Sequence, residues 1–418
     1  MKALLIYFLL FAFWAENVYR ISFSDIRGFS LTNMSMYFVL VAWLLEAGRR
    51  HKLFLSNNLH TPIVLTTFMA FTSILIKLVI GEIPTSLLKE SLDLINWSIP
   101  LLVFLAVFNT LNKESTCYLS LAGLLVLLAA TTITPLVAAL GNIELPGVRS
   151  AGWRIGGFGN VNVYAVYLVM FMPLLFSLGL LGQRSWIRGA AWVLFAVSMI
   201  SLLRTGSRSG VISFVFAMFT YLIIVRKMYP TRLIIVGIVS LSIIASVAVV
   251  ALPSQVKGVF AERLNPQGAE DVYEYTSGRT QIWKNGLLLF LDSPIYGHGQ
   301  NTFLPLNTKR FQLGFSAHNA YLTYMVEQGL IGLSIFVFLL SRIFSHLLRQ
   351  LRSSPNRFAL LVYAGYLAGF CGYAVAMLAG NVATPRYIFW IYTAVVYKLT
   401  YITTESNSSV ASALDAGQ

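Results

Sequence analysis

Twelve long apolar segments constrain the fold of this chain more than any other feature. A helix that crosses a membrane needs about 20 mainly apolar residues. Hydrophobic residues make up 57% of the 418 residues and charged residues only 11%, which is too little charge to cover a soluble domain. The sequence therefore predicts an all-α polytopic integral membrane protein. The predicted spans cover approximately 3–15, 29–45, 61–80, 94–111, 118–140, 161–181, 189–203, 210–225, 233–252, 321–341, 358–379 and 386–402.

One long polar interval divides the predicted spans into two groups. Residues 1–252 hold the first nine and residues 318–403 the last three, with the interval 253–317 between them. Within the interval, Thr280–Leu291 has the apolar spacing of an amphipathic helix, whose apolar face comprises Ile282, Trp283, Leu287, Phe290 and Leu291. We therefore expect an ordered subdomain there. The Ser- and Ala-rich residues 404–418 are expected to form a disordered tail.

The distribution of positive charge predicts the orientation in the membrane. An even number of spans places both termini on one side. If that side is the cytoplasm, most lysines and arginines fall in cytoplasmic segments, including the runs at Arg226–Arg232 and Arg342–Arg357. The interval 253–317 then lies outside. This pattern accounts for the net charge of +14 without a nucleic-acid partner.

Three arginines on the predicted outer side indicate a binding site for an anion. Arg204 and Arg208 are spaced i, i+4 between two spans, and Arg279 opens the amphipathic helix. A guanidinium group offers a planar fork of donors that suits phosphate oxygens. The competing interpretation is that these side chains extend to the membrane surface or pair with acids of the loop.

Two histidines and two asparagines are further candidates for chemistry. His318 lies where the outer loop re-enters a span, and the dipole of a helix N-terminus is expected to lower the pKa of its imidazole. A neutral imidazole there can act as a general base. His298 lies in a glycine-rich turn, and Asn160 and Asn162 follow Gly156–Gly159. Their amides suit sugar or phosphate oxygens. The alternative is a structural role, in particular helix capping.

The sequence contains no motif that predicts a metal site. It has no Asp-x-Asp, no His-x-x-x-His and no Cys-x-x-Cys, and its five histidines are scattered. We therefore expect chemistry that uses no metal and no other cofactor.

Taken in order, the motifs resemble the O-antigen ligase family. Its superfamily includes O-antigen polymerases and bacterial protein O-oligosaccharyltransferases, and the resemblance runs from about residue 157 to residue 333. The motifs that carry it are Gly159-Asn160-x-Asn162, Ser207-Arg208, Gly278-Arg279 with Trp283, Gly297-x-Gly299-x-x-x-Phe303, His318-Asn319-x-x-Leu322 and Glu327-x-Gly329-x-x-Gly332.

The resemblance implies an inverting, metal-independent glycosyltransferase of the lipid-linked-sugar class (GT-C type) in the bacterial inner membrane. Its donor would be O-antigen polysaccharide on undecaprenyl diphosphate, and its acceptor a sugar hydroxyl of lipid A–core oligosaccharide at the periplasmic face. By motif, Arg208 and Arg279 would hold the diphosphate and His318 would activate the acceptor. Arg204 is not part of the motif and is included as a diphosphate contact only because of its proximity to them. The remaining candidate substrate contacts are Asn160, Asn162, His298, Asn319 and Tyr321.

Two alternatives remain open at the level of sequence. The first is a different acceptor within the superfamily, as in an O-antigen polymerase or a protein O-oligosaccharyltransferase. The second is a transporter or flippase of a lipid-linked sugar, for which charges near the middle of the bilayer would be expected.

Overall fold

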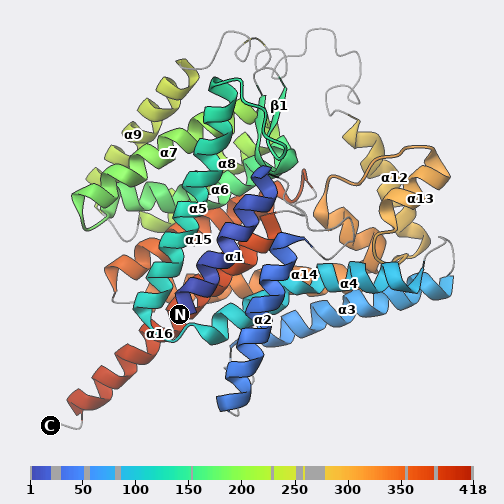
Figure 1. The fold of residues 1–418 in the computed structure, drawn as a ribbon, viewed down its shortest axis with the longest axis horizontal. Coiled ribbons are helices and arrows are strands. Elements are labelled where there is room, and N and C mark those ends of the chain that lie inside the picture. Colours follow the sequence, from blue (N-terminus) through green and yellow to red (C-terminus); the bar gives the residue numbers. More distant parts are fainter. Residues whose placement is uncertain are drawn as a thin grey trace.

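The computed structural model shows a bundle of long helices (Figure 1). It describes residues 2–19, 30–50, 57–80, 86–151, 154–226, 230–250, 258, 278–353, 356–380 and 385–415. Each predicted span overlaps one helix. These helices are α1 (Lys2–Tyr19), α2 (Leu31–Arg50), α3 (His60–Ile80), α4 (Leu87–Thr110), α5 (Glu114–Leu140), α6 (Val161–Leu181), α7 (Ser185–Thr205), α8 (Arg208–Val225), α9 (Thr231–Val250), α14 (Ala320–Ser353), α15 (Arg357–Ala376) and α16 (Pro385–Asp415).

The predicted fold class, an all-α polytopic membrane protein, is confirmed. Among the described residues, nine helices are long and apolar enough to cross a membrane, and α1 contributes a shorter apolar helix. A small hairpin of β1 (Arg149–Ala151) and β2 (Arg154–Gly156) is the exception to the helical pattern. The short helix η1 (Gly157–Gly159) joins it to α6.

Helix α6 forms the centre of the bundle. Every side chain from Tyr164 to Gly179 is buried, as expected for a helix that is apolar on all sides. Helix α15 packs along it through glycines, and a Cβ at Gly369 would lie 2.1 Å from the carbonyl oxygen of Met170. This close approach lets α6 contact α7, α8 and α15 together.

Helix α14 is interrupted at Gly329, where φ is +65° and ψ is −166°. The loop that follows the amphipathic helix enters the interruption, and four backbone hydrogen bonds join the two segments. They run from His298 N to the Val326 carbonyl (2.9 Å), Gly299 N to the Glu327 carbonyl (2.9 Å), Leu330 N to the Pro294 carbonyl (2.8 Å) and Ile331 N to the Ile295 carbonyl (3.4 Å). Backbone groups freed by the break are thereby paired inside the protein.

The predicted amphipathic helix is present as α12 (Arg279–Asp292), and α13 (Phe303–Phe311) follows it. The two pack with the start of α14 around a separate small apolar core. The sequence pattern did not predict α13, because it has nine residues and carries Pro305; a proline is tolerated in a first helical turn. Residues 253–257 and 259–277 of the predicted outer subdomain lie outside the described residues.

Two details differ from the sequence expectations. Leu287 and Leu291, assigned to the apolar face of α12, are 50% and 66% exposed, and Leu289 is buried instead. Helix α16 continues to Asp415 through residues expected to be disordered. The continuation has a physical reason, because no glycine or proline lies between Pro385 and Gly417.

We expect Gly329→Ala to destabilise the protein. A Cβ at this position would lie 2.2 Å from the carbonyl oxygen of Ile295, and its positive φ is unfavourable for alanine. The free energy of unfolding should fall by more than about 1 kcal/mol. The measurement is the midpoint of thermal unfolding of the purified protein in detergent, which should be lower. Gly189→Ala is the control, because Gly189 lies within α7 with nothing within 4 Å of an added Cβ. Equal midpoints for both variants would contradict the role of the break.

Candidate functional site

Three of the residues singled out in the sequence, Asn160, Asn162 and His318, line one cavity of about 160 Å³. We name it the histidine cavity. It lies where the first turns of α6 and α8 and the segment before α14 meet the end of α15. Ser209 and Ser316 add hydroxyl groups to its wall. The sequence did not single out either serine, although each lies within two residues of Arg208 or His318.

Helix N-termini surround the histidine cavity. Asn160 caps α6, its side-chain oxygen accepting from the N–H groups of Asn162 at 2.9 Å and Val163 at 3.3 Å. Ser207 caps α8 by accepting from the N–H of Gly210 at 3.2 Å. The positive ends of these helix dipoles therefore face the cavity region and favour an anion there.

Arg208 and Arg279 are the first residues of α8 and α12, and the charge of one acts on the other. Burial lowers the pKa of Arg279, and the positive charge of Arg208 lowers it further. Each cause disfavours the charged guanidinium. An anion held between the two arginines would act in the opposite direction and stabilise both charges.

His318 lies next to this positive charge. Burial lowers the pKa of its imidazole, and the charge of Arg279 lowers it further. Both effects favour the neutral ring, which a general base requires. The prediction attributed this effect to the helix N-terminus, whereas the structure attributes it first to burial and then to Arg279.

The backbone around His318 is held in an unusual conformation. His318 has a φ of +48°, which non-glycine residues seldom adopt. Its neighbours fix it: the indole N–H of Trp283 donates to the Ala317 carbonyl at 3.0 Å, and the N–H of Ala320 donates to the Met377 carbonyl at 2.8 Å. Trp283 of the Gly278-Arg279 motif therefore has a positioning role, since it ties α12 to the residue before His318.

A chain of side-chain amides shapes the loop before His318. Gln281 donates to Asn285 at 2.8 Å, and Asn285 donates to Asn307 at 3.0 Å. Asn307 is fully buried and donates to the carbonyls of Leu313 at 2.8 Å and Phe315 at 3.1 Å. These bonds connect α12 and α13 with residues 313–317, so the outer helices set the course of the chain into His318.

The other predicted contacts do not line the histidine cavity. The Nε2–H of His298 donates to the Leu289 carbonyl at 2.7 Å, in the packing of α12 against α14. The Asn319 side chain caps α14 by accepting from Leu322 N–H at 3.1 Å, and the Tyr321 hydroxyl donates to the Ala374 carbonyl at 3.0 Å. Arg204 is buried in the last turn of α7. The structure thus gives structural partners to His298, Asn319 and Tyr321.

Glu327 is another motif residue with a structural partner. Its carboxyl oxygen accepts from the backbone N–H of Phe303 at 3.2 Å, at the start of α13. Within the described part of the chain, no group of three His, Cys, Asp or Glu side chains could hold a metal ion.

The resemblance to the O-antigen ligase family is confirmed over part of the chain. Residues 190–337 match the family model Wzy_C, described as O-Antigen ligase. The match contains Arg208, Arg279 and His318 and begins after Asn160 and Asn162. No curated protein matches the chain significantly.

We expect Arg279→Gln to raise the pKa of His318, because it removes a nearby positive charge. The histidine signals of labelled protein can be titrated by NMR, with His318→Gln identifying the relevant one. The pKa should move up toward the ordinary value of about 6.5. Arg310→Gln is the matched control, since Arg310 pairs with Asp292 at the exposed surface of α13. An unchanged pKa in Arg279→Gln would refute the coupling.

Proposed function

We propose that this protein is an O-antigen ligase, which moves O-antigen polysaccharide from undecaprenyl diphosphate to a sugar hydroxyl of lipid A–core oligosaccharide. One observation carries the proposal: the charge of Arg208 acts on Arg279, the charge of Arg279 acts on His318, and His318 lines a cavity between helix N-termini. The family match covers all three residues. This arrangement combines sites for an anionic leaving group and for a neutral base.

The arginines would act on the leaving group. When the glycosidic carbon–oxygen bond of the donor breaks, negative charge develops on the diphosphate. Arg208 and Arg279 are the first residues of two helices, where the positive ends of the helix dipoles add to their charge. Fixed cations can stabilise this charge without a divalent metal, and we therefore include no metal or other cofactor in the reaction.

His318 would act on the acceptor. Its neutral imidazole accepts the proton of the acceptor hydroxyl while the hydroxyl oxygen attacks the anomeric carbon. The new carbon–oxygen bond forms as the bond to the diphosphate breaks, with inversion at that carbon. The proton remains on His318 until solvent removes it. Arginine cannot take this role, because it stays protonated.

We place the site at the periplasmic face of the bacterial inner membrane, with both termini in the cytoplasm. The excess of basic residues in the segments on the side of the termini supports this orientation. In Figure 1 the two termini lie at the lower left, whereas α12 and α13 lie at the right. The arrangement agrees with an active site on the side opposite the termini.

The alternatives differ from this proposal in the acceptor or in the chemistry. An O-antigen polymerase or a protein O-oligosaccharyltransferase would use the same donor with a lipid-linked glycan or a protein hydroxyl as acceptor. A transporter or flippase would move the lipid-linked sugar without transfer. The cluster at helix ends, with a base beside two cations, favours transfer on one side of the membrane.

The deciding experiment supplies purified protein with lipid-linked O-antigen and one acceptor at a time. Lipid A–core, a second lipid-linked glycan and an acceptor protein are tested separately, and the products are separated by gel electrophoresis. Transfer to lipid A–core alone is the expected result. Extension of the lipid-linked glycan alone would identify a polymerase, and an absence of any transfer would reject the enzymatic proposal.

Arg208→Ala and Arg279→Ala should each lower transfer about tenfold or more, because a charge-assisted hydrogen bond contributes about 1.5–3 kcal/mol. Arg279→Lys should restore only part of the activity, since a single ammonium group cannot reproduce bidentate contacts. Arg310→Ala at the exposed end of α13 serves as the control and should transfer normally. Wild-type rates in both site variants would reject the diphosphate role.

His318→Ala should lower turnover by about 10²-fold or more while the donor still binds. In the wild type, kcat/KM should remain constant down to about pH 6.5, the ordinary histidine value, and fall only below it, because the pKa of His318 is lowered. His60→Ala, at the start of α3, is the control. Loss of donor binding in His318→Ala, with normal turnover of any bound donor, would exclude the base role.

A further inference from the structure

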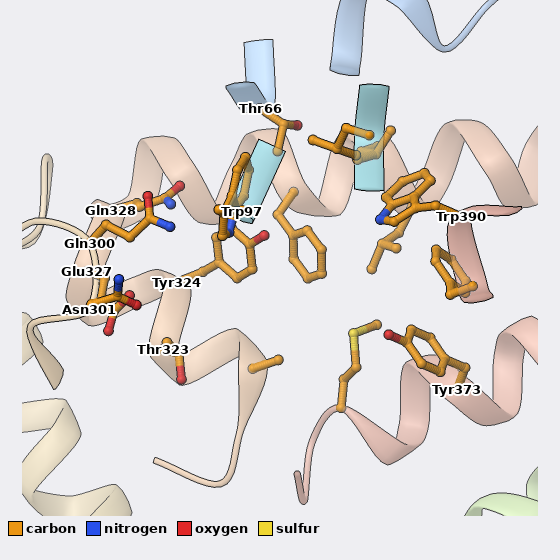
Figure 2. A pocket seen from close by; sticks show the side chains of 17 residues that line it. Thr66, Trp97, Gln300, Asn301, Thr323, Tyr324, Glu327, Gln328, Tyr373 and Trp390 are labelled. Atoms are coloured by element: carbon orange, nitrogen blue, oxygen red, sulfur yellow. The ribbon is translucent and has the colours of Figure 1, made fainter. Parts of the chain in front are cut away.

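A second cavity, of about 270 Å³, begins two residues after His318, at Ala320. It extends between α3, α4, α14, α15 and α16, and we name it the aromatic cavity. Figure 2 shows amide and carboxyl side chains gathered at one end and aromatic rings along the remainder. The transfer chemistry proposed above makes no use of this space, so its lining requires its own explanation.

Two buried amides mark the polar end. Gln300 and Gln328 are each 3% exposed, and both line the cavity. Among the described residues, the side-chain oxygen of neither one has a hydrogen-bond partner. A buried polar group without a partner is destabilising. A ligand hydroxyl would satisfy each amide in either orientation, because a hydroxyl both donates and accepts.

The motif Glu327-x-Gly329-x-x-Gly332 provides the space for the Gln328 side chain. A Cβ at Gly332 would lie 2.2 Å from the Cβ of Gln328 and 2.8 Å from its side-chain oxygen. Glycine at 332 therefore leaves the space that the Gln328 side chain occupies. The Glu327-x-Gly329-x-x-Gly332 motif thus does more than break the helix, since its last glycine admits an amide to the cavity wall.

The aromatic part of the lining comes from three different helices. Trp97 lies on α4, Tyr324 on α14 and Trp390 on α16, and Figure 2 shows them spread along the cavity. A pyranose ring presents C–H groups on its faces and hydroxyl groups around its edge. Its faces can pack against aromatic rings while its hydroxyls meet the amides, which is the usual composition of a small-molecule site.

The polar end has a connection to the surface. Asn301 is exposed and lines this end of the cavity. Its side chain donates to Asp93 of α4 at 3.4 Å. The described lining contains no lysine or arginine but includes the carboxyl group of Glu327. A neutral ligand therefore suits the cavity better than an acidic one.

We propose that the aromatic cavity binds a neutral pyranose residue of the acceptor glycan, beside the hydroxyl that is glycosylated. This inference rests on the proposed function for the identity of the glycan as acceptor. Its location supports that role, because Met377 lines the aromatic cavity and its neighbour Ala376 lines the histidine cavity. A lipid chain is the less suitable occupant, since it would leave both amides unpaired.

Direct binding tests the cavity without the transfer reaction. Saturation-transfer NMR measures binding of methyl α-glucopyranoside and methyl α-galactopyranoside to the protein in nanodiscs of deuterated lipid, with methyl α-glucuronopyranoside as the acidic comparison. We expect binding of at least one neutral glycoside and weaker binding of the acidic one. Gln300→Met, from the polar end, and Trp97→Leu, from the aromatic part of the lining, should each weaken binding about three- to tenfold, the effect of one hydrogen bond or packing contact.

Matched controls separate loss of the site from loss of the fold. Gln350→Met near the end of α14 and Trp186→Leu, with its side chain 66% exposed on α7, should bind as the wild type does. Thermal midpoints establish that all variants are folded. Binding that is unchanged in both cavity variants would overturn the proposal. So would a lipid retained by the wild type in native mass spectrometry and lost from Trp97→Leu.

Kinetics distinguish this proposal from the transferase assignment. Gln300→Met should raise the KM for the acceptor about three- to tenfold and leave kcat and the KM for the donor nearly unchanged. Arg279→Ala should lose transfer but keep glycoside binding. Cavity-dependent binding without any transfer would refute the proposed function alone. Transfer with an acceptor KM that is the same in the cavity variants as in the wild type would refute the acceptor site alone.

Discussion

The end of the bundle that carries α12 depends on hydrogen bonds that an unbroken α14 could not make. At Gly329 the backbone hydrogen-bond ladder of α14 is interrupted, and residues 294–299 form hydrogen bonds with the backbone groups that the interruption leaves free. Gly297, Gly299 and Gly329 all have positive φ, and an added Cβ at each would collide with backbone or with α3. These contacts fasten α12 and α13 to the membrane helices. They also orient the short segment Ala320–Gln328, which begins beside His318.

The same end of the protein concentrates positive charge. Arg279 lowers the pKa of His318 and is itself affected by Arg208, so the sites proposed for base and leaving group are electrostatically coupled. A bound diphosphate would offset the charge of Arg279 and raise the pKa of His318. In the proposed reaction, donor binding would therefore prepare the imidazole to hold the proton it receives. Without bound donor, burial and the charge of Arg279 would both favour the neutral form of His318.

The sequence predicted the features that follow from local composition. The length of apolar runs was enough to locate a helix at each of the twelve predicted spans, nine of which are long and apolar enough to cross a membrane among the described residues. The spacing of Ile282 and Trp283 indicated α12. The sequence did not predict α13 or the break at Gly329, because both depend on contacts between distant segments. Residue chemistry at predicted helix starts singled out Arg208, Arg279 and His318, whose roles remain a prediction. His298 and Tyr321 lie in or beside the same family motifs, but in the fold they donate hydrogen bonds to backbone carbonyls. No local sequence pattern could distinguish such residues from the other candidates.

The arrangement of the two cavities bears on the stereochemistry of the proposed reaction. Inversion requires the attacking oxygen and the departing diphosphate to lie on opposite sides of the anomeric carbon. The charge of Arg208 acts on Arg279 and that of Arg279 on His318, whereas Ala320, two residues further along the chain, lines the aromatic cavity. The bond between Ala320 N–H and the Met377 carbonyl fixes the wall between the cavities. An inverting transfer therefore requires an acceptor held in the aromatic cavity to reach the anomeric carbon from the side away from the arginines, with His318 at its hydroxyl.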